Sequence, residues 1–428
     1  MISSLIFFIT LINFIDRSAI SFVIEPLKKE FHFTDTQFGM ILSAFGMGYI
    51  LLTALGGWLV DKYGPRAMWP LAAVTWSICV GMLGLATGFW SFIAIRFMLG
   101  ITEGPHFPAM SRSISKWLPP KERARALSLG LVAIPLSSVI GAPITSYLVA
   151  DYGWRVMFFS ISAIGILWGF VWYFLFRDNP KDSKYVSQKE LDLITTNSIP
   201  VKSKSEAPIN WNFILTHPAL IANNLAYFAF GYMLFFATLW LPGYFLSQHG
   251  LNLKSVGWYL TIPWLTGALF LKLGGIISDW LYQKTGRSRL ARAHLIWITQ
   301  LLAAIFFVCL SYTTTLNMSI VFLSLGIGFG MMPQSAFFSI NIDVAKEMSG
   351  SSQGITSSFL SIAGVIAPLA TGWLVDLTGN FSSAFLLLAG LTCASVFTVI
   401  FFLHPDREHP AYARKKLKLA EQQSAAGV

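Results

Sequence analysis

Long apolar stretches recur along the chain from Ile2 almost to Leu403, separated by short polar turns. A helix of about 20 apolar residues is long enough to cross the hydrocarbon core of a bilayer, and this span has room for about twelve of them. The expected helices cover residues 2–24, 36–60, 67–88, 90–113, 126–150, 155–176, 218–246, 255–281, 293–312, 316–342, 352–376 and 382–403. The pattern therefore predicts an all-α membrane protein with about twelve transmembrane helices.

Only one long polar segment interrupts the apolar series, between Arg177 and His217. It contains serine, proline and five lysines, Lys181, Lys184, Lys189, Lys202 and Lys204, a composition typical of a mobile linker. We expect a six-helix N-terminal half over 1–176, a cytoplasmic linker over 177–217, a six-helix C-terminal half over 218–403 and a cytoplasmic tail over 404–428. A short surface helix is expected around Val186–Thr195.

Three sequence features of the first half return in the second half in the same order. Gly56-Gly57 with Asp61 is echoed by Gly274-Gly275 with Asp279, Leu99-Gly100-Ile101 by Leu325-Gly326-Ile327, and Ala142-Pro143 by Ala367-Pro368. The offsets between the copies are 218, 226 and 225 residues, so the two halves run in the same direction. Parallel repeats of this kind place a substrate site near the membrane midplane, between the halves.

Composition and charge agree with a chain that is dissolved in a lipid bilayer. Hydrophobic residues make up 55% of the chain and charged residues only 12%, whereas a soluble domain carries roughly a quarter charged residues. The net charge of +10 does not indicate nucleic-acid binding, because the charges lie in short loops and at the C-terminus. We therefore expect no nucleic-acid partner.

The distribution of lysine and arginine predicts the orientation in the inner (plasma) membrane. Arg17, Arg96 and Lys272 fall within expected helices. With the N-terminus inside the cell, only Lys28, Lys29, Arg155 and Lys254 lie outside. The positive-inside rule therefore places both termini in the cytoplasm. The first apolar stretch lacks a preceding basic segment and a cleavage site, so we expect a spanning helix rather than a signal peptide; whether the natural chain begins earlier is left open.

The sequence offers no pattern for a metal, a cofactor or an enzymatic reaction. The cysteines Cys79, Cys309 and Cys393 lie in separate apolar stretches without metal-ligand spacing. An enzyme in the membrane would need metal ligands or a nucleophile with its base at membrane depth, but His32, His217, His249 and His294 lie at loop edges. We expect no metal site, no cofactor, no enzymatic activity and a monomeric protein.

Four charges inside the first half are the strongest functional signal in the chain. They are Asp16 and Arg17 in the first expected helix, and Arg96 and Glu103 in the fourth. A charge at this depth costs at least about 2.5 kcal/mol, so it is rare and usually functional. At the repeat offset of 226, Arg96 and Glu103 correspond to Phe322 and Phe329, which indicates that the fold itself does not require the charges.

Two interpretations of these charges stay open. In the first, an arginine binds a substrate carboxylate in a bidentate fork, while a desolvated carboxylate takes up a proton and a nearby arginine opposes this. Binding of an anion would then change whether the carboxylate keeps its proton. In the second, the four residues are a structural ion-pair network that joins the first and fourth helices.

A loop motif follows the second expected helix and identifies a family. The residues are Gly57-x-x-x-Asp61-Lys62-x-Gly64-x-Arg66, and a degenerate copy over Gly275–Arg289 keeps Asp279. This pattern resembles the signature loop of the major facilitator superfamily, and the resemblance covers the whole chain. It implies that Gly57, Asp61, Lys62, Gly64, Arg66 and Asp279 form a cytoplasmic gate, which holds that side closed while the outside is open.

Further motifs resemble one branch, the anion:cation symporters. They are Asn13-Phe14-Ile15-Asp16-Arg17, Arg96-Phe97 with Glu103-Gly104-Pro105, and Trp117-x-Pro119-Pro120-x-Glu122-Arg123. Bacterial members of this family are similar to proton-coupled importers of galactonate and hexuronate, and animal members include sialin and vesicular glutamate transporters. The resemblance implies that Asp16 and Glu103 carry protons, that Arg17 and Arg96 bind the anion, and that Tyr49 contacts the substrate.

The chain departs from the sugar-acid importers at their hydroxyl-binding positions. Where they carry glutamine and asparagines, this chain has Ile134-Pro135, Ser357 and Ser361, and losing buried donors shifts specificity. His106 and Lys272 are further candidate substrate-site residues, with helix packing and a cytoplasmic surface position as their alternatives.

We expect a transporter that carries a small organic anion, with a sugar acid as the first hypothesis, together with protons. The alternatives are an exporter of organic anions or drugs on the same fold and, more remotely, a membrane sensor or enzyme without transport.

Overall fold

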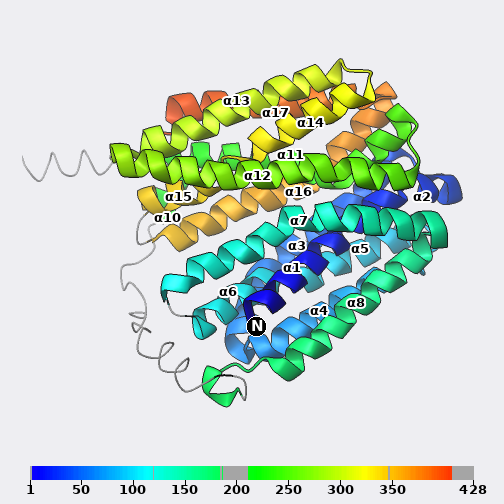
Figure 1. Cartoon of the computed structure of the whole chain (residues 1–428), viewed down its shortest axis with the longest axis horizontal. Coiled ribbons are helices and arrows are strands. Elements are labelled where there is room, and N and C mark those ends of the chain that lie inside the picture. The colour runs from blue at the N-terminus through cyan, green and yellow to red at the C-terminus, as the bar shows by residue number, and fades with distance from the viewer. Residues whose placement is uncertain (1, 119, 184–185, 187–210, 346–347, 407–428) are drawn as a thin grey trace, which may run out of the picture.

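The computed structural model describes residues 2–118, 120–183, 186, 211–345 and 348–406, and the regular elements of this part of the chain are all helical. The expected surface helix over 186–195 and the tail from residue 407 onward lie outside the described residues. Two groups of helices lie side by side, with the N-terminal half in blue to green and the C-terminal half in green to red (Figure 1).

The N-terminal half ends in α8 and a short turn (Pro180–Asp182). Its helices are α1 (Ile2–Ala19) with a 3-10 turn (Ile20–Val23), α2 (Ile24–Phe31), α3 (Asp35–Tyr63), α4 (Pro65–Leu83), α5 (Phe89–Glu103), α6 (His106–Trp117), α7 (Pro120–Tyr152) and α8 (Trp154–Leu175).

The C-terminal half follows a short helix α10 (Trp211–Thr216) inside the expected linker. Its helices are α11 (Pro218–His249), α12 (Leu253–Thr285), a π-helical turn (Arg289–Ala293) leading into α13 (His294–Ser311), α14 (Leu316–Met331), α15 (Gln334–Ala345), α16 (Ser349–Thr378) and α17 (Ser382–Phe402). We call the end of the bundle that holds the turn between α3 and α4 the linker end, and the end that holds the turn between α2 and α3 the far end.

The predicted all-α membrane fold is confirmed. Among the described residues, ten helical segments are long and apolar enough to cross a bilayer, and α3, bent by 52° between Leu52 and Leu55, gives an eleventh. Helices α5 and α6 follow one another across Gly104 and Pro105 and complete the expected twelfth traverse. The predictions of one continuous helix over 90–113 and over 316–342 were wrong, because Pro105 and Pro333 have no N–H to donate and interrupt the helices.

Helices α3 and α5 approach each other closely at two glycines. A Cβ atom on Gly48 would lie 2.0 Å from the carbonyl oxygen of Phe97, and one on Gly100 would lie 2.1 Å from the carbonyl oxygen of Phe45. Small residues let membrane helices pack through their backbones, since no hydrophobic effect drives helices together in lipid. This contact brings the α3 aromatic residues next to the α5 charges.

The two halves meet mainly through two helix pairs, α3 with α16 and α7 with α12. Gly39 of α3 lies against the backbone of Pro368, where a Cβ would be 2.6 Å from the carbonyl oxygen. Gly257 of α12 lies against Ser146 of α7, where a Cβ would be 2.1 Å from the hydroxyl. The space between these two pairs is where the repeat analysis places the substrate site.

We expect Gly100→Ala to lower the apparent Tm of the purified protein by several degrees, because a methyl group that has no room costs about 1–3 kcal/mol. The measurement is thermal unfolding in detergent followed by tryptophan fluorescence. Gly390→Ala is the control, since no atom lies within 4 Å of its added Cβ in α17. Equal melting temperatures for the two variants would contradict the close α3–α5 contact.

Candidate functional site

Two of the predicted charges form an ion pair inside the N-terminal half. The Arg17 Nε on α1 lies 2.6 Å from the Glu103 Oε2 on α5, and the two side chains are 10% and 0% exposed. Burial of both partners removes most of the solvent screening that weakens surface ion pairs. Breaking such a pair by removing one partner is strongly unfavourable, because it leaves an uncompensated buried charge.

Aromatic rings surround the Arg17 guanidinium. Its central carbon lies 4.7 Å from the centre of the Phe14 ring, 4.8 Å from Tyr49 and 5.1 Å from Phe45. The Arg96 guanidinium lies 4.9 Å from the same Phe45 ring. Each contact is a favourable cation–π interaction, stronger where water is excluded. The structure thus brings Arg17, Arg96, Glu103 and Tyr49 together, as the sequence analysis predicts.

Several polar atoms in this cluster have no hydrogen-bond partner among the described residues. They include Nε and Nη1 of Arg96, Nη2 of Arg17 and Oε1 of Glu103, all fully buried. Buried polar groups are nearly always paired in proteins, and unpaired ones call for an explanation. The two guanidiniums therefore present free N–H donors suited to a carboxylate.

Asp16 is held on a different side of α1 from its neighbour Arg17. Its Oδ2 accepts a hydrogen bond of 3.1 Å from the indole Nε1 of Trp76 on α4, and the residue is 1% exposed. No ion pair involves Asp16 in the part of the chain that the structure describes. The two predicted proton carriers thus have different surroundings, one beside an arginine and the other beside a neutral donor.

His106 lies toward α4 and is not hydrogen-bonded to Glu103. The Nδ1 of His106 accepts from the Trp69 Nε1 at 3.3 Å, and its ring is 5.8 Å from the Trp76 ring, edge to face. Sequence reasoning missed both tryptophans as neighbours of the site. Trp69 and Trp76 are seven residues apart on an expected helix and therefore lie on one face. This spacing was the only feature of the sequence that could have pointed to them.

The three candidates from the C-terminal half do not join the charge cluster. Ser357 is exposed, Ser361 is half-buried with its hydroxyl bonded to the Ser357 carbonyl at 3.1 Å, and Lys272 is exposed. Among the described residues, no hydrogen bond, ion pair or cation–π contact connects any of the three to Arg17 or Glu103. Their role in substrate binding stays a prediction.

A small cavity lies between the halves. One of its lining residues, Ser18, directly follows Arg17 on α1. Residues of both halves line it: Ser18, Phe22, Ser138 and Ala142 from the first, and Ala237, Thr238, Pro242, Leu260 and Trp264 from the second. Ser18 and Thr238 each donate to a carbonyl of their own helix, which leaves their oxygens as acceptors. The cavity has room for about one water molecule, which these oxygens can bind.

The gate motif lies at the linker end and makes contacts within its own half. Asp61 is 3.5 Å from Arg112 of α6, and the Lys62 ammonium lies 4.8 Å from the Trp58 ring. Gly64 has a φ of +80°, a conformation that favours glycine, and an added Cβ would lie 2.7 Å from the Asp178 carboxylate. That carboxylate accepts from the backbone N–H of Arg66 at 3.1 Å. A Cβ added to Gly57 would lie 3.8 Å from the Pro108 ring.

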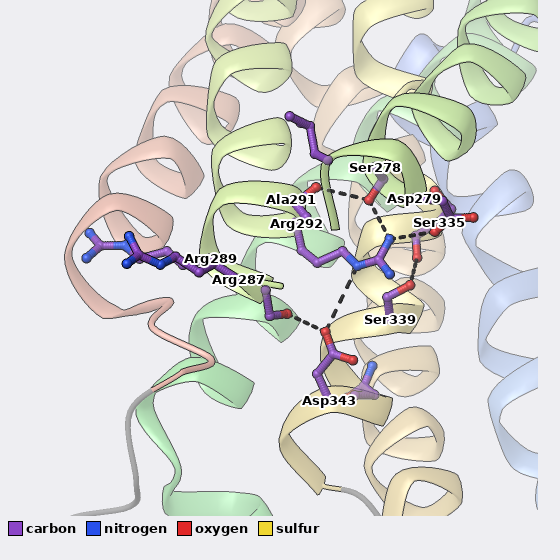
Figure 2. Close-up of polar contacts among 12 residues, drawn as sticks. Ser278, Asp279, Arg287, Arg289, Ala291, Arg292, Ser335, Ser339 and Asp343 are labelled. Carbon is purple, nitrogen blue, oxygen red and sulfur yellow. Dashed lines mark hydrogen bonds and ion pairs between the residues drawn. The ribbon is translucent and has the colours of Figure 1, made fainter. Parts of the chain in front are cut away.

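The second copy of the motif is drawn in Figure 2. The buried Arg292 donates to Asp279 at 2.9 Å and to the Ser278 hydroxyl at 2.6 Å, and Arg287 and Arg289 point away from this cluster. Asp61 and Asp279 are therefore each paired within their own half. In the described part of the chain, no hydrogen bond or ion pair crosses between the halves at the linker end.

The halves are connected instead at the far end. The Asp376 carboxylate, in the last turn of α16, accepts from the backbone N–H groups of Asp35 and Thr36 at 2.9 and 2.6 Å. These are the first residues of α3, so a residue of one half caps a helix of the other. Lys254 of α12 forms an ion pair of 2.5 Å with Asp151 of α7 at the same end.

The fold and this arrangement define a class of protein. Two parallel halves cross the membrane and pack through α3–α16 and α7–α12, and the N-terminal half holds a cluster of buried charges, which is the architecture of a secondary transporter. The Major Facilitator Superfamily profile matches residues 6–368. The chain belongs to this superfamily and is a multi-pass integral membrane protein with a transport function, not an enzyme.

Relatives agree with the predicted branch. The chain is 31% identical to the hexuronate transporter of Bacillus subtilis over 409 residues, which are 95% of each chain. It is 30% identical to the Escherichia coli protein named "Probable galactarate/D-glucarate transporter GudP", with 89% of this chain and 88% of the relative covered. The predicted resemblance to sugar-acid transporters of the superfamily is thus confirmed.

Solved structures share the fold at low sequence identity. A bacterial homologue of the human lysosomal transporter Spinster, in an inward-facing unoccupied conformation, superposes with a TM-score of 0.75 at 18% identity, over 95% of this chain and 98% of that one. The inward-open xylose transporter of Escherichia coli gives 0.73 at 16% identity, over 94% and 95%. These similarities confirm the two-half architecture.

We expect Asp376→Ala to loosen the contact between the halves at the far end, because losing a side-chain cap costs about 0.5–2 kcal/mol. That corresponds to roughly a 2- to 30-fold shift in the population with this end closed. Spin labels at Lys29→Cys and Leu377→Cys, in a background without the three native cysteines, should report a larger share of long distances.

Asp178→Ala is the matched control for this experiment, since Asp178 caps a helix within its own half. It should leave the distance distribution across the far end unchanged. An unchanged distribution in Asp376→Ala would show that the cap does not hold the halves together.

Proposed function

We propose that the protein is a proton-coupled symporter of a small organic anion, with a sugar-acid-like carboxylate as substrate. The observation that carries this proposal is the buried pair of Arg17 and Glu103, with free donors of Arg96 next to it. An arginine grips a carboxylate or a comparable planar anion in a bidentate fork, and the second arginine adds attraction for a second acidic group or for the same one.

Coupling follows from competition for one arginine. A substrate carboxylate that binds Arg17 takes the cation away from Glu103. A carboxylate left without a partner in a low-dielectric site is unfavourable as an anion, so it binds a proton. Substrate entry and proton uptake therefore favour each other, and release of one promotes release of the other.

Asp16 supplies a second position for a proton. Two protons moving with a monoanion would carry one positive charge, so the membrane potential would add about 2.3 kcal/mol per 100 mV to accumulation. One proton with the same substrate would move no net charge. We propose that more than one proton moves per anion, since two buried carboxylates lie in the same half.

Two observations support the substrate class: the free N–H donors of the two buried arginines, and the substrates for which the relatives are named. The transporters named for hexuronate and for galactarate and glucarate share most of this chain's length, and a relative from Cupriavidus necator is named "Probable sulfoacetate transporter SauU" at 27% identity. All these compounds are small anions. Ile134, Ser357 and Ser361, which stand where sugar-acid importers carry glutamine and asparagines, support an anion with fewer hydroxyl contacts.

The transport cycle is alternating access between the two halves. We propose that the linker end and both termini face the cytoplasm, as the distribution of lysine and arginine supports. The contacts of Asp376 and Lys254 then lie on the outer side, and the arrangement corresponds to a state closed outside and open inside. In this orientation the proton gradient drives import.

The test is electrophysiology of reconstituted protein on solid-supported membranes. A hexuronate, galactarate, glucarate, gluconate and sulfoacetate would be applied at two pH values, with xylose as the uncharged control. A proton symporter gives a substrate-dependent current or uptake that changes with pH. If no anion gives a pH-dependent signal or competes for uptake, the assignment to organic anions fails.

We expect Asp16→Asn and Glu103→Gln to abolish proton-driven accumulation while exchange of labelled for unlabelled substrate continues, because exchange needs no release of protons. The measurement is accumulation and counterflow in proteoliposomes with an imposed pH gradient. Glu30→Gln is the control, since Glu30 pairs with Arg155 at the far end and is 38% exposed. Accumulation retained in both site variants would count against the coupling mechanism.

A further inference from the structure

Helix α4 places two fully buried tryptophans, Trp69 and Trp76, beside the charge cluster of α1 and α5. Trp76 donates its indole N–H to the Asp16 Oδ2 at 3.1 Å. The other carboxylate oxygen, Oδ1, is buried and has no partner among the described residues. The indole is thus the one polar group that the structure shows bonded to this carboxylate, within the described part of the chain.

The charged and titratable groups near Asp16 come from several elements, including Tyr49 on α3 against Arg17 and Cys79 on α4 one turn after Trp76. Arg17 is its neighbour on α1, Glu103 and Arg96 lie on α5, and His106 lies on α6. Helices α7 and α8 also lie against α1 and α4 here, at Gly141 next to Ile15 and Gly165 next to Ser77. Over 137–145 and 161–169 these two helices contain no titratable residue.

Trp76 is itself held in place by its surroundings. The His106 ring lies against it at 5.8 Å and against Trp69 at 5.6 Å, both edge to face. The Trp69 N–H fixes that histidine through its Nδ1 at 3.3 Å. The indole N–H of Trp76 therefore points to Asp16 from a packed aromatic group rather than from a mobile side chain.

An indole N–H differs from an arginine as a partner for a carboxylate. It carries no charge and only donates, so it orients the carboxylate and favours its ionised form without neutralising it. A substrate anion competes with Glu103 for Arg17, but it cannot compete for a donor that lies on the α4 side of α1. The two carboxylates therefore differ in their partners: Glu103 can lose its arginine to the substrate, whereas Asp16 keeps its indole donor.

We propose that Trp76 is a positioning residue for proton coupling, which holds Asp16 in place through its indole N–H while Arg17 is paired with Glu103. This inference rests on the proposed role of Asp16 as a proton carrier. It assigns to a tryptophan of α4 a part in the transport cycle that requires no contact with the substrate.

The test compares Trp76→Phe with the wild-type protein in proteoliposomes. Phenylalanine keeps an aromatic ring and removes the N–H. Proton-driven uptake falls as pH rises, and the midpoint of this fall should lie about one pH unit higher in Trp76→Phe than in the wild type. A shift of this size is the effect of losing one hydrogen bond to a charged group. The KM for substrate in counterflow should stay within about twofold, since no substrate contact is lost.

Trp172→Phe is the matched control. Its indole also donates from a buried position, to the backbone carbonyl of Pro65 at 3.2 Å, so it loses a comparable hydrogen bond away from Asp16. It should leave the pH profile unchanged. In an Asp16→Asn background, Trp76→Phe should have no further effect on pH dependence or on counterflow.

The outcomes separate this inference from the proposed function. If wild-type uptake does not depend on pH, the proton-coupled function itself fails. If wild-type uptake depends on pH and Trp76→Phe has the wild-type profile, the positioning role is overturned. It is also overturned if Trp76→Phe reduces counterflow equally in the presence and absence of Asp16, which would show a purely structural role.

A second measurement needs no change at Trp76. In the ¹⁵N–¹H spectrum of protein with labelled indoles, one of the 15 tryptophan signals should move with pH in the wild type and stay fixed in Asp16→Asn. If every tryptophan signal that moves with pH in the wild type also moves in Asp16→Asn, the proposal is overturned. This result does not require Trp76→Phe to fold.

Discussion

The rest of the structure depends on a constraint that the bilayer imposes, namely that a charge buried among apolar helices must find a partner. Arg17 and Glu103 satisfy it with a direct ion pair of 2.6 Å, and aromatic rings take the place of water around the guanidinium. The close α3–α5 contact at Gly48 and Gly100 makes this possible, because it brings those rings to the charges. Removing one partner of such a pair leaves the other as an uncompensated buried charge. A ligand that displaces Glu103 from Arg17 must therefore supply a negative charge of its own.

The two halves share a scaffold but not its chemistry. At the positions equivalent to Arg96 and Glu103, the C-terminal half has Phe322 and Phe329. Phe329 stacks on Phe306 at 5.8 Å and contacts Phe270 edge to face at 5.0 Å. An aromatic group therefore fills in one half the place that charges fill in the other. The first half holds the buried charges of the candidate site, and the second half places aromatic residues at the equivalent positions.

Hydropathy was enough to predict where the chain crosses the membrane, because membrane helices need long apolar segments. It did not predict the helix ends, since the first span reaches Phe31 and α7 begins at Pro120, nor the breaks at Pro105 and Pro333. The buried charges were also evident, since the repeat showed that the fold does not need them. What the sequence could not show depended on packing between distant segments. The bond from Trp76 to Asp16 joins residues 60 positions apart. The break at Gly104–Pro105 was missed as well, and it explains why His106 faces α4 rather than continuing the Glu103 face of a regular helix.

The cap at Asp376 has a consequence for the energetics of the helix pair to which it belongs. Helices α3 and α16 run antiparallel, so the last turn of each lies level with the first turn of the other. Asp61 occupies the last turn of α3 and Asp376 the last turn of α16. A carboxylate is unfavourable at the negative end of its own helix dipole and favourable at the positive end of its neighbour's. Each helix thus carries a charge that is unfavourable for its own dipole. Asp376 is compensated across the halves by the first backbone N–H groups of α3, whereas Asp61 is compensated inside its own half by Arg112. The two ends of this antiparallel pair are therefore not equivalent: one carboxylate joins the two halves, and the other needs nothing from the opposite half.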